Sequence, residues 1–160
     1  MATFSMVSIW QIAAPIEEVY RVIRHSSHWP AWWRGLERVE QLNPGDDNGI
    51  GRVYRYHWKS RLGYRLCFDI RVVRHRSPRL IEGIASGDLQ GTGRWQLSEL
   101  GETTQVRYEW RVRTTRLWMN LTAPIARPIF VWSHNAVMAD GAMGLAQRLN
   151  ARLIGMAHDE

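Results

Sequence analysis

The 160 residues suffice for one domain with a substantial core, and 45% hydrophobic with 22% charged residues excludes a disordered chain. Its one cysteine, Cys67, excludes an internal disulfide and a cysteine-based structural zinc site. The net charge of +6 is compatible with a polyanionic partner, but the basic residues are mostly arginines scattered among apolar positions, which favours a water-facing sheet surface.

The first part of the chain predicts a strand followed by two short helices. Residues 3–13 alternate in the period of two that is typical of a strand. Pro15 suits a first helical position, and the glutamates after it suit the positive end of a helix. Residues 28–33 form an aromatic segment that predicts a turn or a second short helix, and residues 36–42 predict the next strand.

Strong alternation then continues through the middle of the chain. Each segment places apolar and aromatic residues on one face and charged residues on the other, which is typical of successive antiparallel strands. The predicted strands occupy residues 51–59, 64–72, 80–86, 91–97 and 106–113.

The run 122–154 predicts the only long helix. Thr122 is a candidate N-cap, and Pro128 removes a backbone donor, so we expect a short helical piece, a kink and a main helix from Ile129. At 100° per residue one arc is apolar and includes Leu153. Asn135 falls near the middle of this arc.

On the same helical wheel, Ser133 and Asp140 fall on the polar side of the long helix, away from the apolar arc. The long helix is the only element large enough to cover the apolar face of the sheet. We therefore predict a single α+β domain over residues 1–160, with about seven antiparallel strands curved around a long C-terminal helix. Two short helices follow the first strand, and a ligand would occupy the hollow between sheet and helix.

Several segments carry a family resemblance: Ile12-Ala13-Ala14-Pro15-Ile16-Glu17-Glu18-Val19, His28-Trp29-Pro30-Ala31-Trp32, residues 87–95 and residues 118–128. With these segments the chain resembles the START-related helix-grip (SRPBCC) superfamily, and within it the bacterial polyketide cyclase/dehydrase-like proteins. The resemblance implies the helix-grip fold and a hydrophobic cavity between the sheet and the C-terminal helix. Members include lipid carriers, hormone receptors and cyclases, so the fold does not select the chemistry.

Inward-facing rings are the first candidate site. Phenols and indoles stand where a simple core would carry leucine and valine, which favours an aromatic cavity; the alternative is ordinary core rings bonded to backbone carbonyls. The predicted ligand-binding residues are Tyr54, Tyr56, Trp58, Phe68, Trp95, Tyr108, Trp110, Trp132 and Asn135. A second set, Trp29, Trp32 and Trp33, forms either a cavity mouth or, as we favour, a plug for the open end of the sheet.

Candidates for chemistry are few. His134, Asn135 and Tyr108 are the residues that could serve an enzyme, with the amide and hydroxyl polarising carbonyls and the imidazole moving a proton. No metal-ligand spacing, inward pair of carboxylates, nucleophile elbow or nucleotide fingerprint is present, so we expect neither a metal nor a cofactor.

Three functions remain open from the sequence. The first is a binding protein for a small or medium hydrophobic ligand, which is lipid-like, polyketide-like or aromatic. The second is a metal-free cyclase or dehydratase acting in the same cavity, and the third is a module that binds a polyanion or a protein through the arginine-rich outer face.

We expect a small hydrophobic ligand as partner and no specific nucleic acid, and we leave open a homodimer. No secretion signal and no 18-residue apolar stretch is visible, so a cytoplasmic location is the expectation.

Overall fold

The computed structural model describes residues 2–159 of the chain. The elements follow in the order β1 Thr3–Ile12, α1 Ile16–Arg24, η1 Ser26–Ala31, β2 Leu36–Asn43, β3 Val53–Lys59, β4 Arg65–Arg76, β5 Leu80–Gly87, β6 Leu89–Leu100, β7 Thr103–Thr114, α2 Leu117–Arg148 and β8 Leu153–Asp159.

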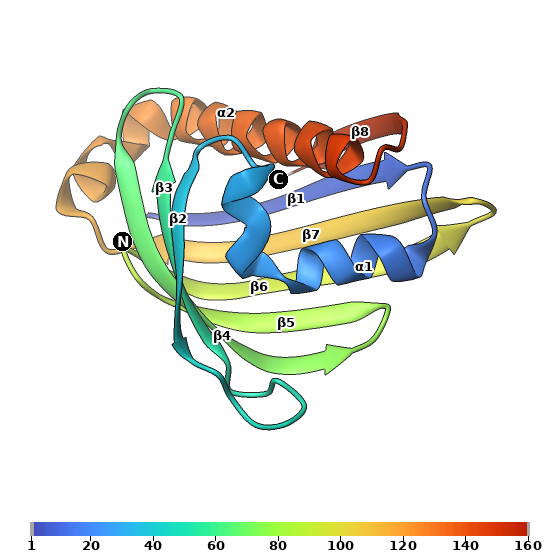
Figure 1. Cartoon of the computed structure of the whole chain (residues 1–160). Helices are drawn as coiled ribbons and strands as arrows, with labels where there is room; N and C mark the ends of the chain where they lie inside the picture. The colour runs from blue at the N-terminus through green and yellow to red at the C-terminus, as the bar shows by residue number, and fades with distance from the viewer. Residues whose placement is uncertain (1, 160) are drawn as a thin grey trace.

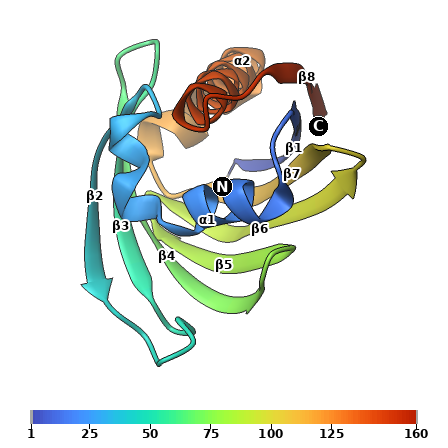
Figure 2. The same cartoon turned by 45° about the vertical axis from the view of Figure 1, so that its right-hand side comes forward.

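All strands belong to one antiparallel sheet in the order β2-β3-β4-β5-β6-β7-β1-β8. The strands from β2 to β7 each pair with the next one along the chain, β1 lies beside β7, and β8 forms the edge beyond β1. The sheet curls, and α2 lies across its concave side while α1 and η1 cover one end (Figure 1). Figure 2 shows α2 nearly end-on above the curved strands. The predicted helix-grip architecture is confirmed.

The end of the long helix differs from the prediction. The helix stops at Arg148, and Leu153 belongs to β8, which pairs with β1 as an eighth strand. Asn150 takes a positive φ of 50°, a conformation that asparagine tolerates better than most residues, and this ends the helix. The amides of Asn150 and Ala151 donate to the last helical carbonyls and satisfy them.

The start of the long helix was also predicted too late. α2 begins at Leu117 and includes both Pro124 and Pro128. Contacts outside the helix hold its first turns, since the Asn120 side chain accepts a hydrogen bond from the Ala2 amide and donates one to the Thr114 carbonyl. These bonds fix the first turn of the helix, ahead of the two prolines, which lack backbone donors.

Two glycines allow α2 to lie directly against the aromatic segment around η1. A Cβ atom at Gly144 would overlap the carbonyl oxygen of Trp32, and one at Gly141 would lie 2.5 Å from the indole of Trp33. Glycine at these two positions therefore sets how closely the helix covers the end of the sheet.

Gly144→Ala is expected to destabilise the protein by about 1–3 kcal/mol, although alanine is the better helix former, because the backbone of Trp32 has to move. Urea denaturation measures the free energy of unfolding. Gly155→Ala is the matched control, since the nearest atom to its new Cβ lies 3.9 Å away. Equal stability of the two variants would contradict the close contact.

Candidate functional site

A ring-lined cavity lies between the sheet and α2 and consists of two adjoining chambers. The first chamber encloses about 130 Å³ and the second about 100 Å³. They are neighbours because they share the wall residues Trp58, Phe68, Leu89, Trp110, His134 and Val137. Both walls are mainly apolar, so the cavity favours a hydrophobic occupant.

The strands supply most of the rings. The first chamber is lined by the predicted residues Tyr54, Tyr56, Trp58, Phe68, Trp95, Tyr108 and Trp110. The alternation of the strands places them on one face, and sheet register makes them neighbours, as with Trp95 opposite Tyr108. These two rings lie 4.1 Å apart between centroids. A Cβ at Gly93 would lie 2.9 Å from both the Tyr108 hydroxyl and the Trp110 ring, so this glycine gives them room.

The tryptophans of the η1 region close the chamber. Trp29 and Trp33 are buried and line the first chamber, with their indole N–H groups donating to the carbonyls of Val22 and Val137 at 3.2 and 2.8 Å. Trp32 is half-buried, stacks on Trp33 and lies outside both linings. This is the geometry of a plug, in which two of the three indoles form cavity wall.

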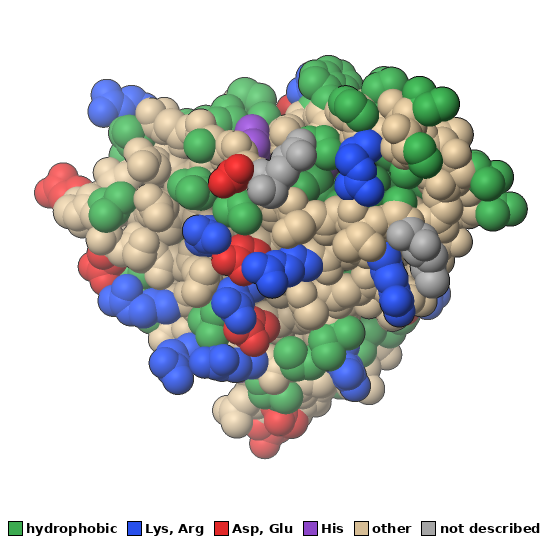
Figure 3. All heavy atoms as spheres, turned by 180° about the vertical axis from the view of Figure 1, so that it is seen from behind, with side chains coloured by type: hydrophobic (Ala, Val, Ile, Leu, Met, Phe, Trp, Pro, Cys, Tyr) green, Lys and Arg blue, Asp and Glu red, His purple; other side chains and the backbone are tan. Residues whose placement is uncertain are grey.

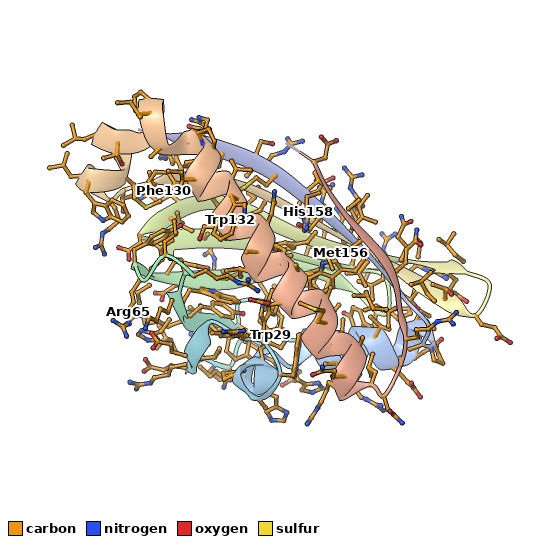
Figure 4. All side chains as sticks on the ribbon, turned by 90° about the horizontal axis from the view of Figure 1, so that it is seen from above. Trp29, Arg65, Phe130, Trp132, Met156 and His158 are labelled. Carbon is orange, nitrogen blue, oxygen red and sulfur yellow. The ribbon has the colours of Figure 1, made fainter. Side chains whose placement is uncertain are left out.

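Two predicted wall residues of α2 lie elsewhere. Trp132 is 54% exposed and Asn135 is half-buried, and neither lines a chamber. Figure 4 looks down on α2 as it crosses the strands, with Phe130 and Trp132 labelled on it. The residues of α2 that line the chambers are Met119, Phe130, Ser133, His134, Val137 and Met138, and the last five form a stripe with spacings of three and four.

The predicted polar side of α2 is wrong at two positions. Ser133 is buried and lines the second chamber. Asp140 is buried and forms an ion pair with Arg61 at 2.6 Å, which ties the β3–β4 turn to the helix. The partner comes from 79 residues earlier in the chain, so the helix pattern alone gives no sign of it.

His134 is the polar group at the junction of the two chambers. Burial lowers the pKa of its imidazole to about 4, an effect that the Asn135 side chain partly offsets. Its Nδ1 atom is buried and has no hydrogen-bond partner among residues 2–159. The site therefore offers a neutral imidazole with an unused ring nitrogen to whatever occupies the cavity.

The other polar groups of the cavity are neutral as well. Burial raises the pKa of both Tyr56 and Tyr108, so their hydroxyls stay protonated. Tyr56 donates to the Ser26 hydroxyl at 2.9 Å. The buried hydroxyl oxygens of Ser60 and Ser133, which line the second chamber, have no partner in the described part of the chain. A ligand with one or two hydroxyl or carbonyl groups could form hydrogen bonds with these unpartnered polar atoms.

Several arginines of the outer face of the sheet form ion pairs within the chain. Arg55 binds Asp69 at 2.8 Å, and Glu82 on β5 pairs with Arg94 at 2.9 Å. These ion pairs account for many of the scattered arginines without any external partner. Within residues 2–159 no cluster of three or more His, Cys, Asp or Glu residues could hold a metal ion, and no helix is long and apolar enough to cross a membrane.

The whole cavity falls inside a family match. Residues 1–153 match the family described as polyketide cyclase / dehydrase and lipid transport. The chain belongs to this family. This match confirms the predicted resemblance to polyketide cyclase/dehydrase-like proteins. No curated protein sequence matches the chain.

Several solved structures share this fold. The Zhui aromatase/cyclase from Streptomyces sp. R1128 has a TM-score of 0.77 at 17% identity, over 93% of this chain and 94% of that one. A START superfamily protein from Mycobacterium smegmatis has a TM-score of 0.74 at 18% identity, over 92% of this chain and 98% of that one. The major latex-like protein 151 of Panax ginseng has a TM-score of 0.68 at 10% identity, over 91% of this chain and 97% of that one. At these identities the likeness shows the fold alone.

Proposed function

We propose that this protein binds a compact, largely planar hydrophobic ligand between the sheet and α2. The observation that carries the proposal is a ring-lined cavity with a neutral imidazole at the junction of its chambers, whose Nδ1 atom has no hydrogen-bond partner in the described part of the chain. The rings provide dispersion contacts and exclude water, while His134 and Tyr108 orient a polar substituent.

The volumes limit the ligand. An apolar cavity of ~150 Å³ accommodates benzene. Adjoining chambers of about 130 and 100 Å³ therefore suit a molecule on the order of two fused rings. The family description, which names both cyclases and lipid transport, supports the same class of ligand.

Titration with 2-naphthol and with naphthalene tests this function, followed by the quenching of tryptophan fluorescence. We expect both probes to bind and 2-naphthol to bind about tenfold more tightly, since its hydroxyl meets a buried polar partner. Val137→Phe, which fills the wall shared by both chambers, should weaken both probes. Tyr108→Phe should reduce the preference for the hydroxyl.

Trp132→Phe is the control, because this exposed indole lies outside both chambers and its loss should leave both affinities unchanged. If Val137→Phe binds both probes as the wild type does, the binding site is elsewhere and the proposed function fails.

The second candidate function is a cyclase or dehydratase acting on a polyketide-like chain, and the state of His134 favours it. A neutral imidazole can accept the proton of a carbon between two carbonyls. The enolate carbon then forms a bond to a carbonyl carbon further along the ligand, whose oxygen takes a proton. Loss of that hydroxyl as water, with a neighbouring C–H proton, leaves the new double bond.

Turnover of a linear poly-β-ketone thioester, followed by mass spectrometry as loss of one water, separates catalysis from binding. His134→Gln should abolish dehydration and retain binding of the probe 2-naphthol. Equal turnover in this variant would exclude the imidazole as the base.

A further inference from the structure

Three polar side chains of the second chamber each have a buried atom without a hydrogen-bond partner within residues 2–159. One is His134, which lies at the junction because it lines both chambers. The other two, Ser60 and Ser133, line the second chamber alone, so their hydroxyls lie beyond the junction. The second chamber therefore has a polar site of its own, separate from the polar groups of the first.

Ser133 gives the stronger of the two hydroxyl signals. Its side chain is only 1% exposed. A serine or threonine inside a helix can satisfy its hydroxyl by donating to the carbonyl four residues earlier, and Thr122 does so in α2, with 2.7 Å to the Trp118 carbonyl. Ser133 makes no such bond to any described residue. A buried hydroxyl without a partner is unfavourable, so a ligand that supplies the partner would be bound favourably.

Ser60 reaches the same chamber from the β3–β4 turn. Its amide donates to the Tyr64 carbonyl at 2.9 Å, so the turn is closed by its own backbone. The ion pair between Arg61 and Asp140 ties this turn to α2, the helix that carries Ser133. The backbone that carries each hydroxyl is thus fixed before a ligand arrives, which lowers the entropy cost of binding a small group between them.

No charged side chain reaches the second chamber. Its lining, as far as the structure describes it, contains no arginine, lysine, aspartate or glutamate, and the imidazole of His134 is neutral. Figure 3 shows Lys and Arg side chains on the outer surface, with Asp and Glu side chains among them. A carboxylate in the second chamber would lose its hydration without gaining a counter-ion. A carbonyl oxygen is neutral and accepts two hydrogen bonds, which matches two hydroxyl donors.

We propose that the second chamber binds a neutral carbonyl group of the ligand, with Ser60 and Ser133 donating hydrogen bonds to its oxygen. The ring system of the same ligand lies against the aromatic wall of the first chamber, and His134 lies between the two parts. This inference rests on the proposed function and deepens it, because it makes an aryl ketone the preferred class of ligand and the two serines the residues that select it.

A matched pair of probes tests the carbonyl site. 2-Acetylnaphthalene carries the carbonyl, and 2-isopropenylnaphthalene has the same shape with a CH2 group in place of the oxygen. Titration followed by tryptophan fluorescence should show that the ketone binds about tenfold more tightly than the alkene. In Ser60→Ala/Ser133→Ala this preference should disappear, because the ketone loses both donors, while the alkene binds as it does to the wild type.

Ser8→Ala is the matched control. Ser8 is also buried, but its hydroxyl already has a partner in His158 Nδ1 at 3.0 Å, and it lines neither chamber. This variant should keep the preference for the ketone. Infrared spectroscopy of bound 2-acetylnaphthalene adds a direct readout, since a hydrogen-bonded carbonyl should absorb at a lower frequency in the wild type than in the double variant. The double variant should keep the circular dichroism spectrum and the 2-naphthol affinity of the wild type.

Two results would overturn the inference and leave the proposed function standing. One is a preference for the ketone that survives in Ser60→Ala/Ser133→Ala, and the other is no preference in the wild type although 2-naphthol binds. If 2-naphthol and both new probes fail to bind, the proposed function fails as well.

A third probe tests the exclusion of charge. 2-Naphthoate, which carries a carboxylate in place of the acetyl group, should bind less tightly than the ketone. Tighter binding of 2-naphthoate that depends on the two serines would make the second chamber a site for anions and would contradict the proposed neutral carbonyl.

Discussion

Replacing Trp33 by alanine is expected to destabilise the folded protein by about 3–5 kcal/mol. The side chain is 3% exposed and contacts rings from three directions, with centroids 5.7 Å from Trp10, 5.2 Å from Trp29 and 5.1 Å from Trp58. Its indole N–H also donates to the Val137 carbonyl of α2. One residue thus joins the aromatic segment, the sheet and the long helix.

Urea denaturation of Trp33→Ala measures this effect, and Trp32→Ala is the control. Trp32 is the same residue type and stacks on Trp33, but it is only half-buried, so its loss should cost less than half as much. Equal losses of stability in Trp33→Ala and Trp32→Ala would contradict the tight packing of Trp33 in the wall of the first chamber.

The faces of the strands could be predicted from the sequence because they follow from a local rule. A period of two places Tyr54, Tyr56 and Trp58 together whatever the rest of the chain does. The covering of that face by the long helix also follows, because an apolar sheet face of this size needs an apolar partner.

The phase of the long helix could not be predicted in the same way. An apolar arc fitted over residues 122–154 places Asn135 inside and Ser133 outside, but the observed inward stripe includes Ser133 and His134. Hydrophobicity alone misses the inward stripe for two reasons. The cavity wall includes polar residues, and the exposed side of the helix carries apolar residues such as Ile125 and Ile129. The fit also assumed a helix that continued through Asn150, where a left-handed residue starts the turn into β8.

The sequence predicted His134 as a candidate for its chemistry, and its spacing is the signal that could have placed it in the cavity wall. It lies four residues after Phe130 and four before Met138, both buried apolar residues of α2. A histidine in register with such a stripe is expected to be buried.

The stability of the protein is expected to fall as the pH is lowered from about 6.5 toward 4, because desolvation of the half-buried His134 side chain favours its neutral form. Burial holds the pKa of this imidazole at about 4, below its ordinary value near 6.5. The unfolded chain therefore takes up the proton first as the pH falls. The stabilisation is complete above about pH 6.5 and is lost through this window, by up to about 3 kcal/mol at its lower end.

Urea denaturation at pH 7.5 and at pH 4.5 measures the loss in the wild type and in His134→Gln. Between these pH values the wild type should lose about 2–3 kcal/mol more than the variant. Burial also lowers the pKa of His158 and adds a loss of the same sign, but this contribution is present in both proteins and cancels in the difference. His28→Gln, at an exposed position, should follow the wild type.

Parallel pH curves for wild type and His134→Gln would contradict a buried, neutral imidazole, and the consequence reaches the proposed chemistry. Only the neutral ring can accept a hydrogen bond from a ligand hydroxyl or a proton from a ligand carbon. The pH dependence of unfolding measures this state without any ligand. If an activity assay fails, this measurement therefore distinguishes two causes. Either the cavity lacks a neutral imidazole that can act as the base, or the base is present and the assay used the wrong substrate.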